Sequence, residues 1–252
     1  MNELSNAFSL LEVDVADEED LKGIVVANNG VNSEGKKGKG KKDSENHGGT
    51  TLTNDGNKTD QTAKEAYEEY RQPLVWIDLE MTGLNVDVDR ILEIACIVTD
   101  GNLTKSIEGP DLVIQQTEEC LDKMGEWCQS HHGESGLTKR VLQSKLSEEE
   151  AEEKVVEFVK RHVGSYTPLL AGNSVYVDLL FLKKYMPKLA SLFPHVLVDV
   201  SSLKALCIRW YPRENKKAPQ KTNKHRAMDD IKESIAELKF YKNNIFKLKS
   251  RK

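Results

Sequence analysis

Two carboxylates lie within a stretch of the chain that otherwise has the composition of a buried strand. The stretch is LVWIDLE, residues 74–80, in which Asp78 and Glu80 are separated by Leu79. Side chains alternate between the faces of a strand, so Trp76, Asp78 and Glu80 point to one face and the aliphatic residues to the other. Burying a carboxylate is costly unless a cation or hydrogen bonds offset the lost hydration. This face therefore predicts a nearby cation or, alternatively, a solvated strand end.

The composition changes near residue 72. Residues 1–72 hold 15 acidic and 9 basic side chains, and their central run, GKKGKGKKDSENHGGTTLTNDGNKTDQT, almost lacks large apolar residues. Such a segment buries too little apolar surface to offset the entropy of ordering. We therefore expect a disordered, low-complexity acidic extension over residues 1–72, a folded domain over residues 73–247 and a basic tail over residues 248–252.

The sequence also limits the cellular setting. The acidic N-terminal region is unlike a mitochondrial transit peptide, and neither a secretory apolar region nor an apolar run of membrane-spanning length is present. The cysteines lack the paired spacing of disulfide frameworks or zinc sites, so we expect reduced thiols at Cys96, Cys120, Cys128 and Cys207. These features predict an intracellular protein without a membrane segment, in the cytoplasm or nucleus rather than in mitochondria.

From residue 73 onward, strand and helix patterns are mixed. PLVWIDLE, RILEIACIVT and residues 102–115 predict three strands of an antiparallel meander, and PLLAGNS and HVLVDVS predict strands that each lead into a helix. Helical periodicity predicts helices over residues 118–129, 137–144, 147–162 and 227–243. Together these patterns predict a single α/β domain with a mixed five-stranded sheet flanked by helices.

Two further carboxylates, Asp178 and Asp230, are expected to face inward from helices. Asp178 precedes Phe181, Leu182 and Tyr185 at spacings of three, four and seven, which places it on their buried stripe. Asp199, in contrast, directly precedes a helical segment and is expected to cap it.

The last helix carries neighbouring aspartates with different expected environments. On a helical wheel, Asp230 lies at the edge of the apolar stripe whereas Asp229 points away from it and is expected to be solvated. His225 directly precedes this helix, where an ordinary surface histidine is the alternative interpretation.

Four inward carboxylates without matching cationic side chains predict a metal site. Hard divalent cations prefer oxygen ligands. Two such ions about 3.5–4 Å apart could hold the attacking and leaving oxygens of a phosphodiester, with a histidine taking a proton from the attacking water.

The ordered set Asp78-x-Glu80, Asp178 and His225-x-x-x-x-Asp230 resembles the DEDDh 3′-to-5′ exonucleases, which have an RNase H-like fold. WIDLEMTGL, GNSVYVDLLFLKKYMPKL and HRAMDDIKESIAEL narrow the resemblance to the oligoribonucleases, over nearly all of residues 73–247. It implies that the four carboxylates bind two divalent cations, Mg²⁺ or Mn²⁺, and that His225 is the general base. It further implies a homodimer that degrades short oligoribonucleotides to 5′-mononucleotides.

The resemblance also implies substrate contacts, although Trp127 as a plain core residue is an open alternative. The implied contacts are Met81, Leu84, Trp127, His132, Ser135, Ser174 and His195. The family completes a cap over the 5′ phosphate with a tyrosine and an arginine from the second subunit, whereas this chain has His195 and Val196 at those positions.

Residues 213–226 carry six basic side chains against one acidic one, which would attract RNA near a phosphodiester site, although a solvated loop is the default interpretation. Two alternative functions remain from the sequence. One is a DEDDh exonuclease that acts on longer RNA 3′ ends or on DNA, and the other is a noncatalytic RNA-binding scaffold with the same fold.

Overall fold

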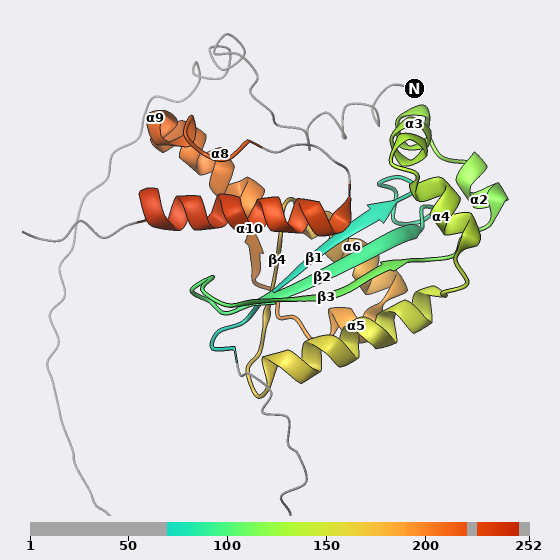
Figure 1. Ribbon diagram of the computed structural model, residues 1–252, viewed down its shortest axis with the longest axis horizontal. Coiled ribbons are helices and arrows are strands. Elements are labelled where there is room, and N and C mark those ends of the chain that lie inside the picture. Colours follow the sequence, from blue (N-terminus) through green and yellow to red (C-terminus); the bar gives the residue numbers. More distant parts are fainter. Residues whose placement is uncertain (1–69, 221–225, 247–252) are drawn as a thin grey trace, which may run out of the picture. The chain divides into compact units, whose positions relative to one another are not determined.

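The computed structural model describes residues 70–220 and 226–246, and these residues form a sheet with helices on both faces (Figure 1). His225, residues 1–69 of the expected extension and the expected basic tail lie outside the described residues. The strands are β1 (Leu74–Met81), β2 (Ile91–Thr99), β3 (Ser106–Val113), β4 (Leu169–Gly172) and β5 (Leu197–Asp199).

The five strands are ordered β3-β2-β1-β4-β5 in the sheet. β1 pairs with β2 and β2 with β3 in antiparallel fashion, whereas β4 is parallel to both β1 and β5. The expected mixed five-stranded sheet is therefore confirmed.

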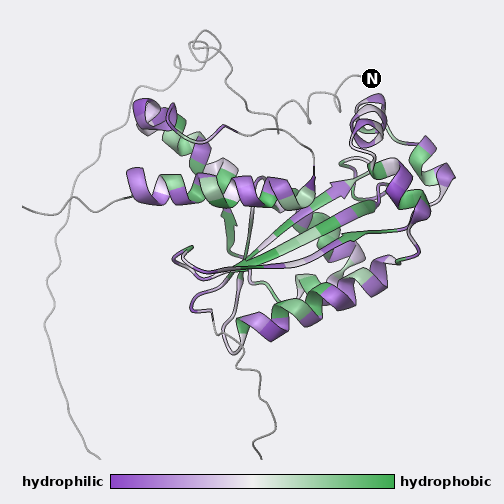
Figure 2. Cartoon of the chain, viewed as in Figure 1, coloured by the Kyte–Doolittle hydropathy of each residue, from purple (hydrophilic) through white to green (hydrophobic). Residues whose placement is uncertain are grey.

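Nine helices surround this sheet within the described residues. They are α2 (Glu118–Asp122), α3 (Glu126–Glu134), α4 (Leu137–Gln143), α5 (Glu148–Val163), α6 (Tyr176–Tyr185), α7 (Pro187–Ala190), α8 (Val200–Trp210), α9 (Pro212–Asn215) and α10 (Ala227–Asn244). Figure 1 shows α10 and α5 on opposite sides of the sheet, and in Figure 2 both helices carry alternating polar and apolar stripes.

The sheet separates two apolar clusters, and β1 contributes to both. Val75, Ile77 and Leu79 pack in the cluster that contains residues of α5 and α6. Trp76 packs in the cluster that contains residues of α8 and α10. Because the faces alternate along a strand, Asp78 lies on the α10 side with Trp76.

Helix boundaries follow the expected caps at two places. The Ser147 hydroxyl accepts the Glu150 backbone N–H at 3.2 Å, and the Glu150 carboxylate in turn accepts the Ser147 N–H at 2.9 Å, so the expected capping box of α5 is confirmed. Asp199 accepts the Ser201 backbone N–H at 2.9 Å, which confirms the expected cap of α8.

The expected continuous helix over residues 118–129 is wrong. The chain instead forms α2 and α3, which are separated at Lys123–Gly125. Gly125 is in an extended conformation and begins α3, while the Met124 side chain is buried. Glycine is a poor residue for a helix interior and burial of Met124 stabilises the turn, so tertiary packing outweighs the local helical pattern here.

Tyr70 belongs to the folded domain although it precedes the expected boundary. Its side chain is 3% exposed and packs in the apolar cluster on the α5 side. The neighbouring Arg71 carbonyl accepts the Gly101 N–H at 2.9 Å. The folded domain therefore includes residues that composition alone places in the extension.

We predict that Tyr70→Ala lowers the free energy of unfolding by about 3–5 kcal/mol, because it leaves a cavity in the core. Phe246→Ala is the matched control, since Phe246 is 56% exposed and a surface substitution is expected to change stability by only about 0.5 kcal/mol. Denaturant unfolding of the full chain measures both effects. Equal stability of the two variants would show that Tyr70 does not belong to the core.

Candidate active site and metal centre

Three carboxylates converge on the α10 side of the sheet. Asp78 and Glu80 come from β1, and Asp230 comes from the first turn of α10. Each offers a carboxylate oxygen, and these oxygens all lie within 4.8 Å of one another. Asp229, which the sequence predicts to be solvated, is outside this group and is partly exposed.

Asp178 reaches the same strand from α6 but does not belong to the group of three. Its side chain is 6% exposed, and its Oδ1 accepts the backbone N–H of Leu79 at 2.9 Å. The parallel pairing of β1 with β4 covers Leu74 to Trp76, so the strands separate before Leu79. The separation of the strands leaves the Leu79 amide available to a side chain from α6.

The electrostatics of this cluster disfavour full ionisation without a cation. Burial raises the pKa of Glu80 well above its usual range, the nearby Asp230, Glu93 and Asp178 raise it further, and Arg226 acts in the opposite direction. Burial also raises the pKa of Asp178 to about 8, against the lowering effect of the Leu79 amide. A donor set made only of carboxylate oxygens fits a hard divalent cation, whose charge would relieve this repulsion.

His132 is packed behind the end of β1. It is buried, its Nε2 lies 2.9 Å from the Met81 carbonyl oxygen, and its Nδ1 lies 3.9 Å from Glu80 Oε2. Ser135 follows α3, and its hydroxyl donates to the His132 carbonyl at 3.4 Å. His132, which the resemblance assigns to substrate together with Met81, therefore lies between the Met81 backbone and Glu80 of the carboxylate cluster.

Trp127 on α3 is half-buried and is not a residue of either apolar cluster. Its ring stacks on His131, with centroids 3.9 Å apart and an interplanar angle of 21°. The sequence interpretation missed His131, although its spacing of four from Trp127 in a helical segment predicts adjacent side chains.

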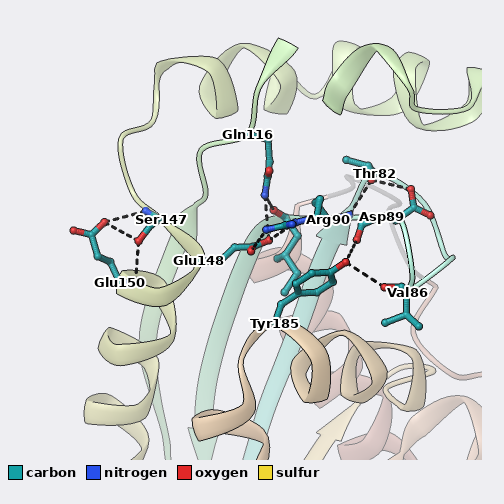
Figure 3. Close-up of polar contacts among 10 residues, drawn as sticks. Thr82, Val86, Asp89, Arg90, Gln116, Ser147, Glu148, Glu150 and Tyr185 are labelled. Atoms are coloured by element: carbon teal, nitrogen blue, oxygen red, sulfur yellow. Dashed lines mark hydrogen bonds and ion pairs between the residues drawn. The ribbon is translucent and has the colours of Figure 1, made fainter. Parts of the chain in front are cut away.

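The loop between β1 and β2, residues 82–90, carries the half-buried Leu84 and is held by hydrogen bonds (Figure 3). The Thr82 hydroxyl donates to Asp89 Oδ1 at 2.9 Å, and Asp89 Oδ2 accepts a backbone N–H of the loop at 2.8 Å. The Tyr185 hydroxyl of α6 donates to the Asp89 carbonyl at 2.7 Å. Helix α6 therefore supports this loop as well as carrying Asp178.

Arg90 closes the base of the same loop (Figure 3). Its guanidinium lies 4.6 Å from the centroid of the Tyr185 ring and forms an ion pair with Glu148 of α5. Gln116 donates to the same Glu148 carboxylate at 3.2 Å. These contacts tie the loop to α5 and α6, which fixes the backbone next to Leu84.

Ser174 lies between β4 and α6 in the left-handed backbone region, with φ of 53°. Its N–H donates to Asp199 Oδ1 at 3.0 Å, and its hydroxyl donates to the Ser201 hydroxyl at 3.2 Å. Two hydroxyls are therefore adjacent at this end of the sheet. His195, the remaining expected contact, is exposed in the segment before β5.

The sequence interpretation also missed a charge cluster in which the buried Glu93 pairs with the partly exposed Arg140 and Arg226. Glu93 is fully buried in β2, where all nine residues are buried. A single charge in such an apolar strand was the available signal, because buried charges are normally paired.

Comparisons with known proteins identify the family. The exonuclease family model named RNase_T matches residues 75–238. The oligoribonuclease of Arabidopsis thaliana is 75% identical over 179 residues, which cover 71% of this chain and 81% of that protein. The mitochondrial oligoribonuclease of Homo sapiens is 50% identical over 187 residues, covering 74% and 79%. The oligoribonuclease of Haemophilus influenzae is 49% identical over 178 residues, covering 71% and 97%.

Solved structures of exonuclease I share the fold. One aligns with a TM-score of 0.55 at 15% identity over 69% of this chain, and another, from Methylocaldum szegediense, has a TM-score of 0.54 at 16% identity over the same share. The aligned regions cover 42% and 41% of those chains, so this similarity shows the domain fold alone. By its sequence, its fold and its cluster of carboxylates, the chain belongs to the oligoribonuclease family of 3′-to-5′ exoribonucleases.

Proposed function

We propose that this exoribonuclease acts on single-stranded RNAs a few nucleotides long and releases 5′-mononucleotides from their 3′ ends. The observation that carries the proposal is the convergence of Asp78, Glu80 and Asp230 within 4.8 Å, with Asp178 bound to the same strand. The high identity to oligoribonucleases along the domain supports the substrate class.

Divalent metal use follows from the family and the acidic cluster, and we propose two ions, Mg²⁺ or Mn²⁺, with Asp78, Glu80, Asp178 and Asp230 as ligands. Such ions supply charge stabilisation for the attacking and leaving oxygens of an in-line displacement. The strand and the two helices hold the carboxylates at fixed positions, so the chain provides orientation without reorganisation during the reaction.

We propose His225 as the general base, because it lies five residues before Asp230 in the family's motif. In this role its imidazole accepts the proton of the attacking water, the water oxygen bonds to phosphorus, and the bond from phosphorus to the 3′ oxygen breaks. The leaving 3′ oxygen then takes a proton from solvent. A neutral imidazole is required for the first step, and an unperturbed histidine is largely neutral above about pH 6.5.

The proposed substrate contacts surround this centre on the loop and on α3. Leu84 would pack against the terminal base from the supported loop, and Trp127 would offer a ring already oriented by His131. Ser174 would contact the 5′ phosphate of a very short RNA. His132 lies on the same helix as Trp127 and Ser135 directly follows it, and both would help to shape the base pocket.

We also propose a homodimer, in which the exposed His195 contributes to the 5′ end of RNA bound by the partner. Exposed large apolar side chains on α6 and α8 support an additional protein contact: Tyr176, Leu180, Leu206 and Trp210. A histidine can donate to phosphate, although the family uses a tyrosine at this position.

None of the described helices is long and apolar enough to cross a membrane. We keep a cytoplasmic or nuclear location as a prediction from the sequence, since the relatives include mitochondrial and bacterial proteins.

We predict that kcat/KM with Mg²⁺ or Mn²⁺ is highest for RNA dinucleotides and falls with increasing length, because a capped pocket fits both ends of a short substrate. The experiment follows release of 5′-mononucleotides from a length series of single-stranded RNAs and from matched DNAs. Equal values for short and long RNAs, or faster cleavage of DNA, would replace the proposed substrate with longer 3′ ends.

We predict that Asp230→Asn lowers metal-dependent kcat/KM by more than about 100-fold, since even outer partners of a metal site are worth about 10–100-fold. The neighbouring Asp229→Asn is the matched control. It should change kcat/KM by less than about fivefold, because a charge that does not bind the metal acts through weak electrostatics. Similar losses in both variants would overturn the assignment of Asp230 as the ligand.

A further inference from the structure

Glu93 places a second acidic side chain next to a proposed metal ligand. In the antiparallel pairing of β1 and β2, Glu93 is directly opposite Glu80. Directly opposed side chains in such a pair share one face, with Cβ atoms roughly 4.5–5.5 Å apart. Like charges at this position repel each other, and Glu93 is fully buried. Its carboxylate therefore requires a cationic partner.

Two arginines provide that partner from different elements. Arg140 of α4 donates from Nη1 to Glu93 Oε1 at 2.9 Å, and Arg226, the residue that begins α10, places Nη2 3.7 Å from the same oxygen. Glu93 therefore connects β2 both to α4 and to the start of the helix that carries Asp230. Figure 1 shows α10 beginning near the end of β1.

The cluster leaves hydrogen-bonding capacity unused. Within the described part of the chain, no partner is present for the buried atoms Glu93 Oε2, Arg140 Nε, Arg140 Nη2 and Arg226 Nε. The Arg226 side chain is 38% exposed, but its Nε is buried, and because an unsatisfied buried donor is costly the guanidinium would gain from an additional carboxylate within reach.

Asp230 is such a carboxylate. Its backbone N–H donates to the carbonyl of Arg226, the extended N-cap residue of α10, at 3.0 Å, so the two residues are neighbours at the start of the helix. Glu80 is also nearby, since it lies directly opposite Glu93 in the pairing of β1 and β2, and Arg226 Nη2 lies 3.7 Å from Glu93 Oε1. The Arg226 guanidinium could therefore pair with Glu93 or with one of two proposed metal ligands, Glu80 and Asp230.

We propose that Glu93 is a positioning residue that holds the Arg226 guanidinium away from Glu80 and Asp230 and so keeps these carboxylates available to the divalent cation. A guanidinium is permanently charged and binds carboxylates through two parallel hydrogen bonds. Once paired with Glu80 or Asp230, it would occupy the oxygens that bind the metal. The inference rests on the proposed ligand roles of these two residues.

A double-mutant cycle on the full chain tests this role, with the Mn²⁺ dissociation constant measured by calorimetry without RNA. We expect Glu93→Gln to weaken Mn²⁺ binding by about tenfold and Arg226→Gln alone to change it by less than about threefold, with affinity recovered in the double variant. In that case the change in Mn²⁺ affinity in the double variant differs from the sum of the changes in the two single variants. Additive effects, which a long-range charge effect alone predicts, would overturn the proposal.

A second variant, Glu93→Asp, distinguishes sequestration of Arg226 from a long-range effect of the Glu93 charge. It keeps the negative charge, but its shorter side chain cannot reach Arg226 as well. Sequestration predicts weaker Mn²⁺ binding in this variant, whereas unchanged affinity overturns it. It also keeps the test decisive if Glu93→Gln does not fold. Glu237→Gln is the control for loss of a buried carboxylate, since Glu237 is buried on α10 and accepts a hydrogen bond from the Tyr241 hydroxyl. It should leave Mn²⁺ affinity unchanged.

The wild-type measurement distinguishes failure of this inference from failure of the proposed function. If the wild-type chain binds Mn²⁺ and Asp230→Asn abolishes that binding, the ligand assignment stands and the cycle tests Glu93 alone. Absence of Mn²⁺ binding by the wild-type chain would overturn both the ligand assignment and the role of Glu93.

Discussion

Mutual repulsion among carboxylates gathered on one face of the sheet is the constraint on which the site depends. The alternation of β1 places Asp78 and Glu80 on the α10 side, and Asp230 joins them within 4.8 Å. Their charges cannot all be accommodated at low cost in a half-buried site. The arrangement is therefore poor for the stability of the metal-free chain and suited to binding a divalent cation.

Hydrogen bonds and ion pairs around the site stabilise the neighbouring carboxylates Asp178 and Glu93, but they leave the charges of the central cluster in place. Separation of β1 from β4 leaves the Leu79 N–H free of a strand partner, and this N–H donates a hydrogen bond to the Asp178 carboxylate. On the other side, Arg140 and Arg226 form ion pairs with Glu93, a carboxylate outside the proposed metal site. The loop that carries Leu84 and the stacked ring of Trp127 are held by separate contacts, which do not depend on the charged centre.

Much of this organisation could be predicted from local patterns, and the rest depends on register and packing. The alternation around Asp78 and the capping box of α5 follow from periods of two and from residue spacing. The break at Gly125 required knowledge that Met124 is buried. The opposition of Glu80 and Glu93 depends on the strand register, which a single sequence does not specify, and the burial of His132 depends on how α3 packs against β1.

Anomalous diffraction from crystals containing Mn²⁺ tests the central claim most directly, since it locates the metal without reference to activity. We expect manganese peaks within coordination distance of Asp78, Glu80 and Asp230, with one ion also reaching Asp178, and Arg226 still paired with Glu93. Manganese bound elsewhere, or no manganese at these carboxylates in a chain that still hydrolyses RNA, would contradict it.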